Sequence, residues 1–350
     1  MGYTLCMCKN KSRLRFVGTA VLAAAVLIAG VLAGCTKPAP KEHIEPDAAH
    51  DKFIVGFSQI GAESAWRIFN SKSMQSAADK EGIQLLFSNA EQKQENQIKA
   101  IRSFIMYQVD VIVFVPIVQD GWDLVLKDAK DAGIPVIICD RKIVTEDESL
   151  YAGYIGTDSA EEGRNAAKFL QKKYADVNRL IRILEIRGTD GSSASDDRMK
   201  GFHEIIDSDT RFSIVYSESG DFMRSRGKEI ARNILEQNGN RLAIDGNAVD
   251  VILSANDGMT LGFLEVLNEH GIKTGSDITV VTFDAQQEAM DRLIAGEINC
   301  VLECNPDLGM QVMSLVKKVA AHEHIPRSTH VAERVFSEFD DLSDIAPRGY

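Results

Sequence analysis

Residues 109–141, VDVIVFVPIVQDGWDLVLKDAKDAGIPVIICDR, decide the class of the fold. The runs at 111–116 and 134–139 are short and apolar, as in strands that are buried on both faces of a sheet. Between them, residues 121–133 have the spacing of an amphipathic helix. The stretch therefore predicts a strand, a helix and a second strand that runs parallel to the first.

The same alternation extends in both directions along the chain. We expect strands at 52–59, 83–89, 109–116, 134–141, 179–188, 212–220, 249–257, 277–285 and 298–306. We expect helices at 67–82, 92–108, 121–133, 159–175, 193–209, 224–239, 258–271 and 286–296. Two successive series of similar length predict an α/β fold with two doubly wound, Rossmann-like lobes. In such parallel sheets ligands bind beyond the carboxyl ends of the strands, so a site is expected at those ends.

The N-terminal region predicts export from the cytoplasm. Residues 1–34 contain four basic and no acidic residues, and an apolar run at 16–32 precedes Leu-Ala-Gly-Cys at 32–35. This order is typical of a secretory signal peptide. The last four residues resemble a bacterial lipobox, which implies a lipid on Cys35 and a chain anchored to a membrane. The alternative is a transmembrane anchor, which the apolar run of about 17 residues disfavours because it is short for a span.

The part of the chain after the signal peptide is acidic. Residues 35–51 are rich in proline and charge and predict a flexible tether, and the roughly 300 residues that follow suit two domains. Without residues 1–34 the chain has 35 basic and 51 acidic residues, so the formal net charge changes from −12 to −16. This charge argues against nucleic acid or an anionic lipid surface as a partner.

The three cysteines after Cys35 do not form a convincing site. Cys300 and Cys304 are about 13 Å apart if their strand is extended, which is too far for a disulfide. Their spacing lacks a nearby histidine or third cysteine, so it is a poor metal site. We interpret both, together with Cys139, as small buried residues, and we expect neither a metal nor a cofactor.

Residues that can bind a polar ligand follow almost every predicted strand. They are Glu63, Ser64, Trp66, Arg67, Asp140, Arg141, Asp196, Asp197, Arg198, Asp221, Phe222, Asn256, Asp257, Asp284, Glu303 and Asn305. Carboxylates, amides and guanidinium groups can each engage two neighbouring hydroxyls of a sugar, and Trp66 and Phe222 could cover its two faces. Single residues also have structural explanations, since Asp196, Asp257 and Asp284 could be helix N-caps and Phe222 could belong to the core.

Several longer motifs resemble one family. VGFSQIGAESAWR at 55–67, EQKQENQIKAIRSF at 91–104, GWDLVLKDAKDAGIPV at 121–136 and SGDFMRSRGKE at 219–229 are similar to periplasmic sugar-binding proteins of the ribose-binding type. The resemblance is strongest to the galactofuranose-binding subgroup, covers 52–350, and extends to the ligand-binding core of the lactose-repressor family. It implies the periplasmic-binding-protein type I fold, with two lobes joined by a three-stranded hinge.

The resemblance also implies roles for individual residues. Trp66 and Phe222 would stack on the sugar, and polar contacts would come from Arg67, Asp140, Arg141, Arg198, Asn256 with Asp257, and Asp284. The last hinge position falls on Glu303 or, in an equally fair alignment, on Cys304. Where ribose binders commonly have asparagine, this chain has Val115, which argues against ribose itself.

The resemblance further implies a hinged receptor. The crossings between lobes fall near Gly156, Asn305 and Val331, which gives one lobe of 52–156 with 305–331 and another of 157–304 with 332–350. The expected function is that of a substrate-binding lipoprotein, a monomer outside the cytoplasm, which captures a neutral monosaccharide and presents its closed form to the permease and ATPase of an ABC transporter.

The sequence gives less support to other functions. No nucleophile elbow, phosphate loop or zinc spacing is present, so we expect no enzyme and no catalytic residue. A repressor would need a helix-turn-helix where the signal peptide and tether stand. Two alternatives remain open, namely a sensory protein that signals to a chemoreceptor or kinase, and an anionic ligand such as a sugar acid or phosphate held by Arg67, Arg141 and Arg198.

Overall fold

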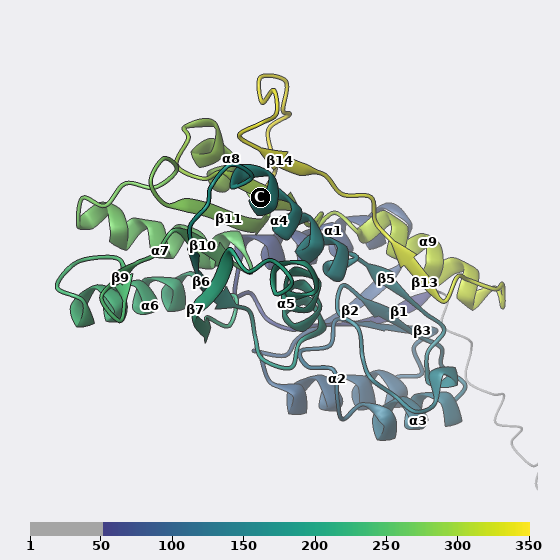
Figure 1. The fold of residues 1–350 in the computed structure, drawn as a ribbon. Coiled ribbons are helices and arrows are strands. Elements are labelled where there is room, and N and C mark those ends of the chain that lie inside the picture. Colours follow the sequence, from purple (N-terminus) through teal and green to yellow (C-terminus); the bar gives the residue numbers. More distant parts are fainter. Residues whose placement is uncertain (1–51) are drawn as a thin grey trace, which may run out of the picture. The chain divides into compact units, whose positions relative to one another are not determined.

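The computed structural model describes residues 52–350, and all statements about structure refer to them. The predicted signal peptide, Cys35 and the tether at 35–51 lie outside the described residues. The described chain contains two six-stranded sheets and a short hairpin of β8 (Ala243–Ile244) with β9 (Asn247–Ala248) (Figure 1).

The first sheet is parallel throughout, with the strand order β13-β5-β4-β3-β1-β2. Its strands are β1 (Ile54–Gln59), β2 (Gln84–Asn89), β3 (Val111–Phe114), β4 (Val136–Cys139), β5 (Gly153–Gly156) and β13 (Ser328–His330). Its helices are α1 (Ala65–Lys80), α2 (Gln94–Met106), α3 (Asp123–Asp131), the single 3-10 turn η1 (Glu148–Leu150) and α9 (Gly309–Ala320). Helix α1 packs with α9, and α2 packs with α3 across the sheet from them (Figure 1).

The second sheet has the order β14-β12-β11-β10-β6-β7, and only its edge strand β14 is antiparallel. Its strands are β6 (Ile181–Arg187), β7 (Phe212–Ser219), β10 (Val251–Ser254), β11 (Thr279–Asp284), β12 (Cys300–Glu303) and β14 (Val335–Ser337). Its helices are α4 (Ser159–Lys173), α5 (Ser193–Ile206), α6 (Arg224–Gln237), α7 (Asp257–Glu269) and α8 (Gln287–Ile294). Helices α4 and α5 pack together, and α7 packs against both α6 and α8.

Each sheet has its own hydrophobic core. The first core includes Phe57, Phe114 and Trp122, and the second includes Phe202 and Phe283, all of them fully buried. The apolar strand residues that indicated a parallel sheet therefore lie between two helical layers, and the predicted α/β fold with two parallel sheets is confirmed.

The chain passes between the two sheets in three places. It leaves the first sheet after β5 and enters α4, it returns from β12 to α9, and it leaves again between β13 and β14. The short connecting segments are 157–158, 304–308 and 331–334. Two lobes that share three crossings can rotate about them as a hinge.

Helix α1 begins two residues earlier than the sequence predicts. The side chain of Ser64 caps it by accepting a hydrogen bond of 3.1 Å from the backbone N–H of Arg67. Trp66 and Arg67 consequently lie in the first helical turn. None of the helices within residues 52–350 is both long and apolar enough to cross a bilayer.

Candidate ligand-binding site

A small cavity lies where the carboxyl ends of the two sheets meet. Its walls are formed by Glu63, Ser64, Trp66, Arg67, Asp140, Arg141, Ala194, Arg198, Phe222, Asn256, Asp284 and Cys304. These residues follow β1, β4, β6, β7, β10, β11 and β12, so both sheets contribute to one site. The cavity volume of about 30 Å³ holds about two water molecules. A larger ligand therefore requires the walls to move apart.

Trp66 and Arg67 form the wall contributed by α1. The Trp66 side chain is 4% exposed, and its indole Nε1 donates a hydrogen bond of 2.6 Å to the backbone carbonyl of Cys304. The guanidinium carbon of Arg67 lies 4.6 Å from the centre of the Trp66 ring. The Trp66 ring and the Arg67 guanidinium group therefore lie against each other in the wall of one cavity.

Two carboxylates hold Arg67 in place. Its Nε lies 3.1 Å from Glu63 Oε1, and its Nη2 lies 2.8 Å from Asp140 Oδ2. Burial alone would lower the pKa of Arg67, but the two carboxylates raise the pKa above its usual value. Arg67 therefore stays charged although it is buried.

Arg141 lines the cavity without such support. Its Nη1 donates a hydrogen bond of 3.2 Å to the Ile117 carbonyl, and its guanidinium carbon lies 5.0 Å from the centre of the Phe222 ring. Among residues 52–350 it makes no ion pair within 4 Å. Burial and the neighbouring charge of Arg67 lower the pKa of Arg141 to about 10.

Three buried polar atoms at this cavity have no hydrogen-bond or ion-pair partner within the described chain. They are Glu63 Oε2, Arg67 Nη1 and Arg141 Nε. The Asp140 carboxylate is paired with Arg67. Leaving such groups unpaired is costly, and they lie together on one wall. The wall is therefore built to bind a polar ligand.

The second sheet contributes an aromatic ring and a third buried arginine. The Phe222 ring packs on Gly188 so closely that a Cβ atom there would lie 2.0 Å from Phe222 Cζ. Phe222 itself has a positive φ of 60°, and it lines the cavity. Arg198 donates to Glu162 Oε2 at 2.7 Å and to the Ala255 carbonyl at 2.8 Å, and its Nη2 lies 3.9 Å from Asp284 Oδ1.

Asn256 and Asp284 complete this wall. Asn256 caps α7 through a hydrogen bond of 2.9 Å from the Met259 N–H, and its Nδ2 donates to the Phe222 carbonyl. Asp284 has φ of 111°, a strained conformation for a residue with a side chain. Burial raises the pKa of the Asp284 carboxyl well above its usual value, although Arg198 opposes the shift.

Asp257 and Glu303, two of the predicted ligand contacts, lie outside the cavity. Asp257 accepts a hydrogen bond of 2.7 Å from Thr282 and one of 2.7 Å from the Gln286 N–H, so it supports the loop after β11. The Glu303 carboxylate binds Arg348 and accepts a hydrogen bond of 3.0 Å from the Arg334 N–H. The next residue, Cys304, lines the cavity instead, because successive side chains of an extended strand point to opposite sides.

Other lining residues lack a prominent signal in the sequence. Glu63 and Ser64 follow the first strand and were noted there, but their roles as the partner of Arg67 and the cap of α1 depend on where the helix begins. Ala194 has no side-chain chemistry that could have marked it. Asp196 and Asp197 lie away from the wall and bind Gln119 and Lys142.

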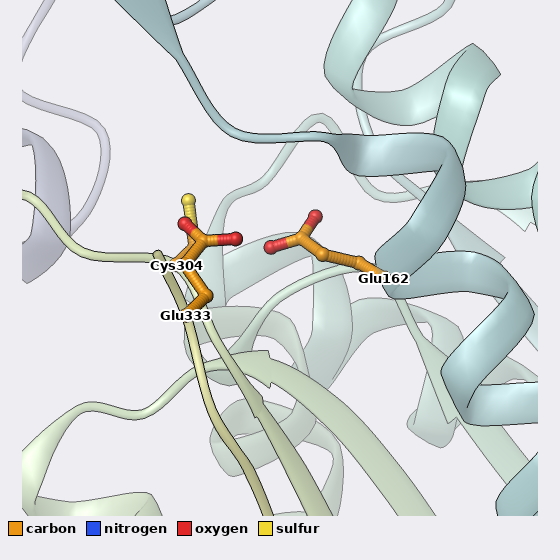
Figure 2. A group of neighbouring side chains, drawn as sticks. All are labelled: Glu162, Cys304 and Glu333. Atoms are coloured by element: carbon orange, nitrogen blue, oxygen red, sulfur yellow. The ribbon is translucent and has the colours of Figure 1, made fainter. Parts of the chain in front are cut away.

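The three crossing segments meet beside the cavity. Figure 2 shows the carboxylates of Glu162 and Glu333 facing each other next to the thiol of Cys304. One carboxylate oxygen from each glutamate and the Cys304 sulfur lie within 4.8 Å of one another, as in a possible metal site. Glu333 accepts hydrogen bonds from Thr157 Oγ1 at 2.6 Å and from the Asn305 N–H at 3.3 Å. One carboxyl on the third crossing therefore contacts both of the others.

This cluster is better suited to a proton than to a metal ion. Burial and the Glu162 carboxylate raise the pKa of Glu333 to about 9, and burial also raises the pKa of Glu162. The Arg198 guanidinium already binds Glu162 and would repel a second cation. The Cys304 thiol is buried, and burial raises its pKa well above the usual value.

A larger groove of about 1110 Å³ lies at the opposite ends of the first sheet. Its basic residues are already engaged, since Lys317 pairs with Glu81 and Lys130 with Asp147. Among the described residues of this groove, no buried side-chain nitrogen or oxygen lacks a partner. The small cavity, with its unpaired polar groups, is therefore the better candidate.

The sequence and the fold are similar to those of known binding proteins. Residues 55–324 match the model of the periplasmic binding protein domain. The chain is 38% identical over 265 residues to the galactofuranose-binding protein YtfQ of Escherichia coli (strain K12). The aligned region covers 75% of this chain and 81% of that protein.

Two solved structures are similar to the described fold. One, from Mycobacterium smegmatis in complex with β-D-fucofuranose, is 41% identical with a TM-score of 0.77, and the match covers 82% of this chain and 92% of that one. The other is the binding protein of the arabinose ABC transporter from Shewanella sp. ANA-3 with α- and β-L-arabinofuranose bound. It is 37% identical with a TM-score of 0.76, and the match covers 81% of this chain and 91% of that one.

Proposed function

The chain belongs to the periplasmic binding protein family, and from this premise we propose that it is the substrate-binding component of a sugar ABC transporter and captures a furanose sugar. The solved relatives support the ring form, because their ligands are fucofuranose and arabinofuranose. A binding protein of this kind acts outside the cytoplasm and is not an enzyme.

One observation carries the proposal: three unpaired polar atoms and two aromatic rings converge on one cavity. Trp66 from the first sheet and Phe222 from the second would cover the faces of the sugar ring. Glu63, Arg67, Asp140, Arg141, Arg198, Asn256 and Asp284 would bind its hydroxyls. Each unpaired group would gain a partner on binding, which makes a polyhydroxy ligand favourable and an apolar one unfavourable.

The mechanism would depend on the movement of two lobes around the ligand. We assign 52–156 with 305–331 to one lobe and 157–304 with 332–350 to the other, so that each lobe contributes part of the site. The cavity is too small for a sugar in the described form, so binding requires opening, entry and closure. Contacts from both lobes to one ligand stabilise the closed form, which the permease and its ATPase would recognise.

We also propose that Cys35 carries a lipid that holds the chain at the membrane surface. The Leu-Ala-Gly-Cys sequence at 32–35 supports this. Mass spectrometry of the protein purified from membranes tests it, since an unmodified N-terminus at another residue would contradict a lipid anchor.

One observation favours a second ligand class. Arg141 has no ion-pair partner within residues 52–350, and an anionic sugar would provide one. Against it, Glu63, Asp140 and Asp284 line the same cavity and would repel a negative charge.

A thermal-shift screen of residues 36–350 distinguishes these ligands, because a ligand that binds the native state raises the melting temperature. The screen should include L-arabinose, D-galactose, a methyl galactopyranoside that cannot open to a furanose, galacturonate and galactose phosphate. A rise with the reducing sugars and none with the locked pyranoside supports a furanose receptor. A rise only with galacturonate or the phosphate would replace it with an anion receptor.

A further inference from the structure

The segment at 348–350 is anchored to the second sheet. Arg348 binds the Glu303 carboxylate, and its guanidinium carbon lies 5.0 Å from the centre of the Phe336 ring. The N–H of Gln287 on α8 donates a hydrogen bond of 2.7 Å to the Tyr350 carbonyl oxygen. These contacts fix where the Tyr350 side chain begins.

Tyr350 contacts a residue of the cavity wall through its hydroxyl group. The hydroxyl donates a hydrogen bond of 3.1 Å to the backbone carbonyl of Asp284, which also accepts one of 3.3 Å from the Cys304 N–H. Asp284 lines the cavity, and its φ of 111° is unfavourable unless neighbouring contacts hold it. Tyr350 therefore helps to hold the backbone that aims the Asp284 carboxyl at the cavity.

The ring of Tyr350 contacts helix α1 of the first sheet. Its centre lies 5.3 Å from that of Phe69, with an angle of 49° between the ring planes. Phe69 is on α1, one turn after Trp66, and both aromatic rings of the pair are half-buried. Gly349 allows this approach, because a Cβ atom there would lie 2.8 Å from Phe69 Cε2. The pair thus joins the two sheets directly beside the site.

We propose that Tyr350 is a positioning residue for ligand binding and that the Phe69–Tyr350 pair is a latch between the lobes. This inference rests on the proposed function, since a latch matters only if the lobes open and close around a ligand. The hydroxyl fixes the Asp284 carbonyl within one lobe, and the ring contact forms between lobes only when they are closed. The ring contact consequently slows opening, while the hydroxyl affects how well the site fits the sugar.

Release kinetics separate these two effects. The probe is L-arabinose, bound to residues 36–350 and displaced in a stopped-flow instrument with tryptophan fluorescence as the signal. An aromatic pair of this kind is expected to slow release by about 3- to 10-fold, so Phe69→Leu and Tyr350→Leu should each release faster by that factor. The double variant should be no faster than either single one, and the association rate should change little.

Tyr350→Phe isolates the hydroxyl group. It keeps the ring contact, so the release rate should change less than in Tyr350→Leu, while the equilibrium affinity falls. The matched control is Phe339→Leu, which disrupts the Phe169–Phe339 pair, with ring centres 5.6 Å apart. Both rings of the control pair belong to the second sheet's side, so this variant should lower thermal stability and leave the release rate unchanged.

Small-angle scattering of the ligand-free proteins keeps the latch testable even if L-arabinose does not bind. The latch predicts that Phe69→Leu and Tyr350→Leu have a larger radius of gyration than the unmodified protein and Phe339→Leu. Wild-type release rates together with unchanged radii would overturn the latch. A wild-type protein that binds none of the screened sugars would contradict the proposed function. The radii of gyration alone would then test the latch.

Discussion

The Trp66 indole on α1 donates a hydrogen bond of 2.6 Å to the backbone carbonyl of Cys304, directly after β12. The donor belongs to the helical layer of the first sheet and the acceptor to a crossing segment from the second. A ring that lines the cavity is therefore held by one of the three crossing segments. Closure of the lobes and orientation of the Trp66 ring are consequently linked.

Trp66→Ala should weaken sugar binding by about 2–4 kcal/mol, because it removes a large buried aromatic contact. The fold should remain intact, since Trp66 belongs to neither of the two hydrophobic cores. Isothermal titration calorimetry with L-arabinose measures the loss. Trp122→Phe is the control, because Trp122 is fully buried in the first core and should lower stability more than affinity. A normal affinity in Trp66→Ala would contradict a stacking role.

Arg198→Met should destabilise the protein by about 3–5 kcal/mol, because it leaves the buried Glu162 carboxylate without its cation. Adding Glu162→Gln should restore part of this loss. Urea denaturation measures both. Arg164→Met provides the comparison, because its ion pairs with Glu161 and Glu204 are partly exposed and should contribute no more than about 1 kcal/mol. Equal losses in the two arginine variants would rule out this account.

Glu333→Gln should flatten the dependence of stability on pH. The pKa of Glu333 is raised to about 9 in the folded protein from an ordinary value of 4.5, so folding retains a proton. The stability that comes from this group is complete below pH 4.5 and is lost as the pH rises toward 9. Thermal unfolding between pH 5 and 9 measures the slope, and an unchanged slope in the variant would exclude the hinge carboxyl as its cause.

Other groups contribute to the same slope. Burial raises the pKa of Asp257 to about 7, and the hydrogen bond to Glu185 raises the pKa of His203 to about 9. The stability from His203 is present below pH 6.5 and is lost as the pH rises through 9. His203→Gln should therefore flatten only the upper part of the curve, which distinguishes it from Glu333→Gln.

Gly188→Ala should abolish sugar binding by displacing the Phe222 ring, since the added methyl group would lie 2.0 Å from Phe222 Cζ. Gly239→Ala is the control, because nothing lies within 4 Å of its added Cβ atom. It should cost about 1 kcal/mol of stability, from its positive φ, without loss of affinity. Similar binding by the two variants would show that the ring position does not matter.

The alternation of apolar runs and amphipathic helices predicted the fold well, because a parallel sheet buried on both faces leaves a strong signal in sequence. Strands β5, β13 and β14 were not predicted. They have three or four residues each and little apolar character at 328–330, so their pairing depends on partners far away in the chain. The residues of a short strand alone do not indicate which distant segment it pairs with, or in which register.

The strand ends indicated where to search, but not which side chain of each end faces the cavity. Asp257 and Glu303 follow strands as Asn256 and Cys304 do, yet they point to Thr282 and to Arg348. Neighbouring residues of an extended chain point their side chains to opposite sides. The sequence alone does not show which of two neighbours points into the cavity. The contact of Tyr350 with Phe69 joins positions 281 residues apart, which no local pattern could predict.

The order of the strands also constrains how the protein is made. The first sheet takes its edge strand β13 and its covering helix α9 from residues 309–330, after the whole second sheet except β14 has been synthesised. A chain that emerges from the ribosome N-terminus first therefore cannot complete its first lobe until nearly the last residue is available. Completion of the first lobe is thus postponed until residues 309–330 are available, and the part of its core that α9 contributes is missing until then.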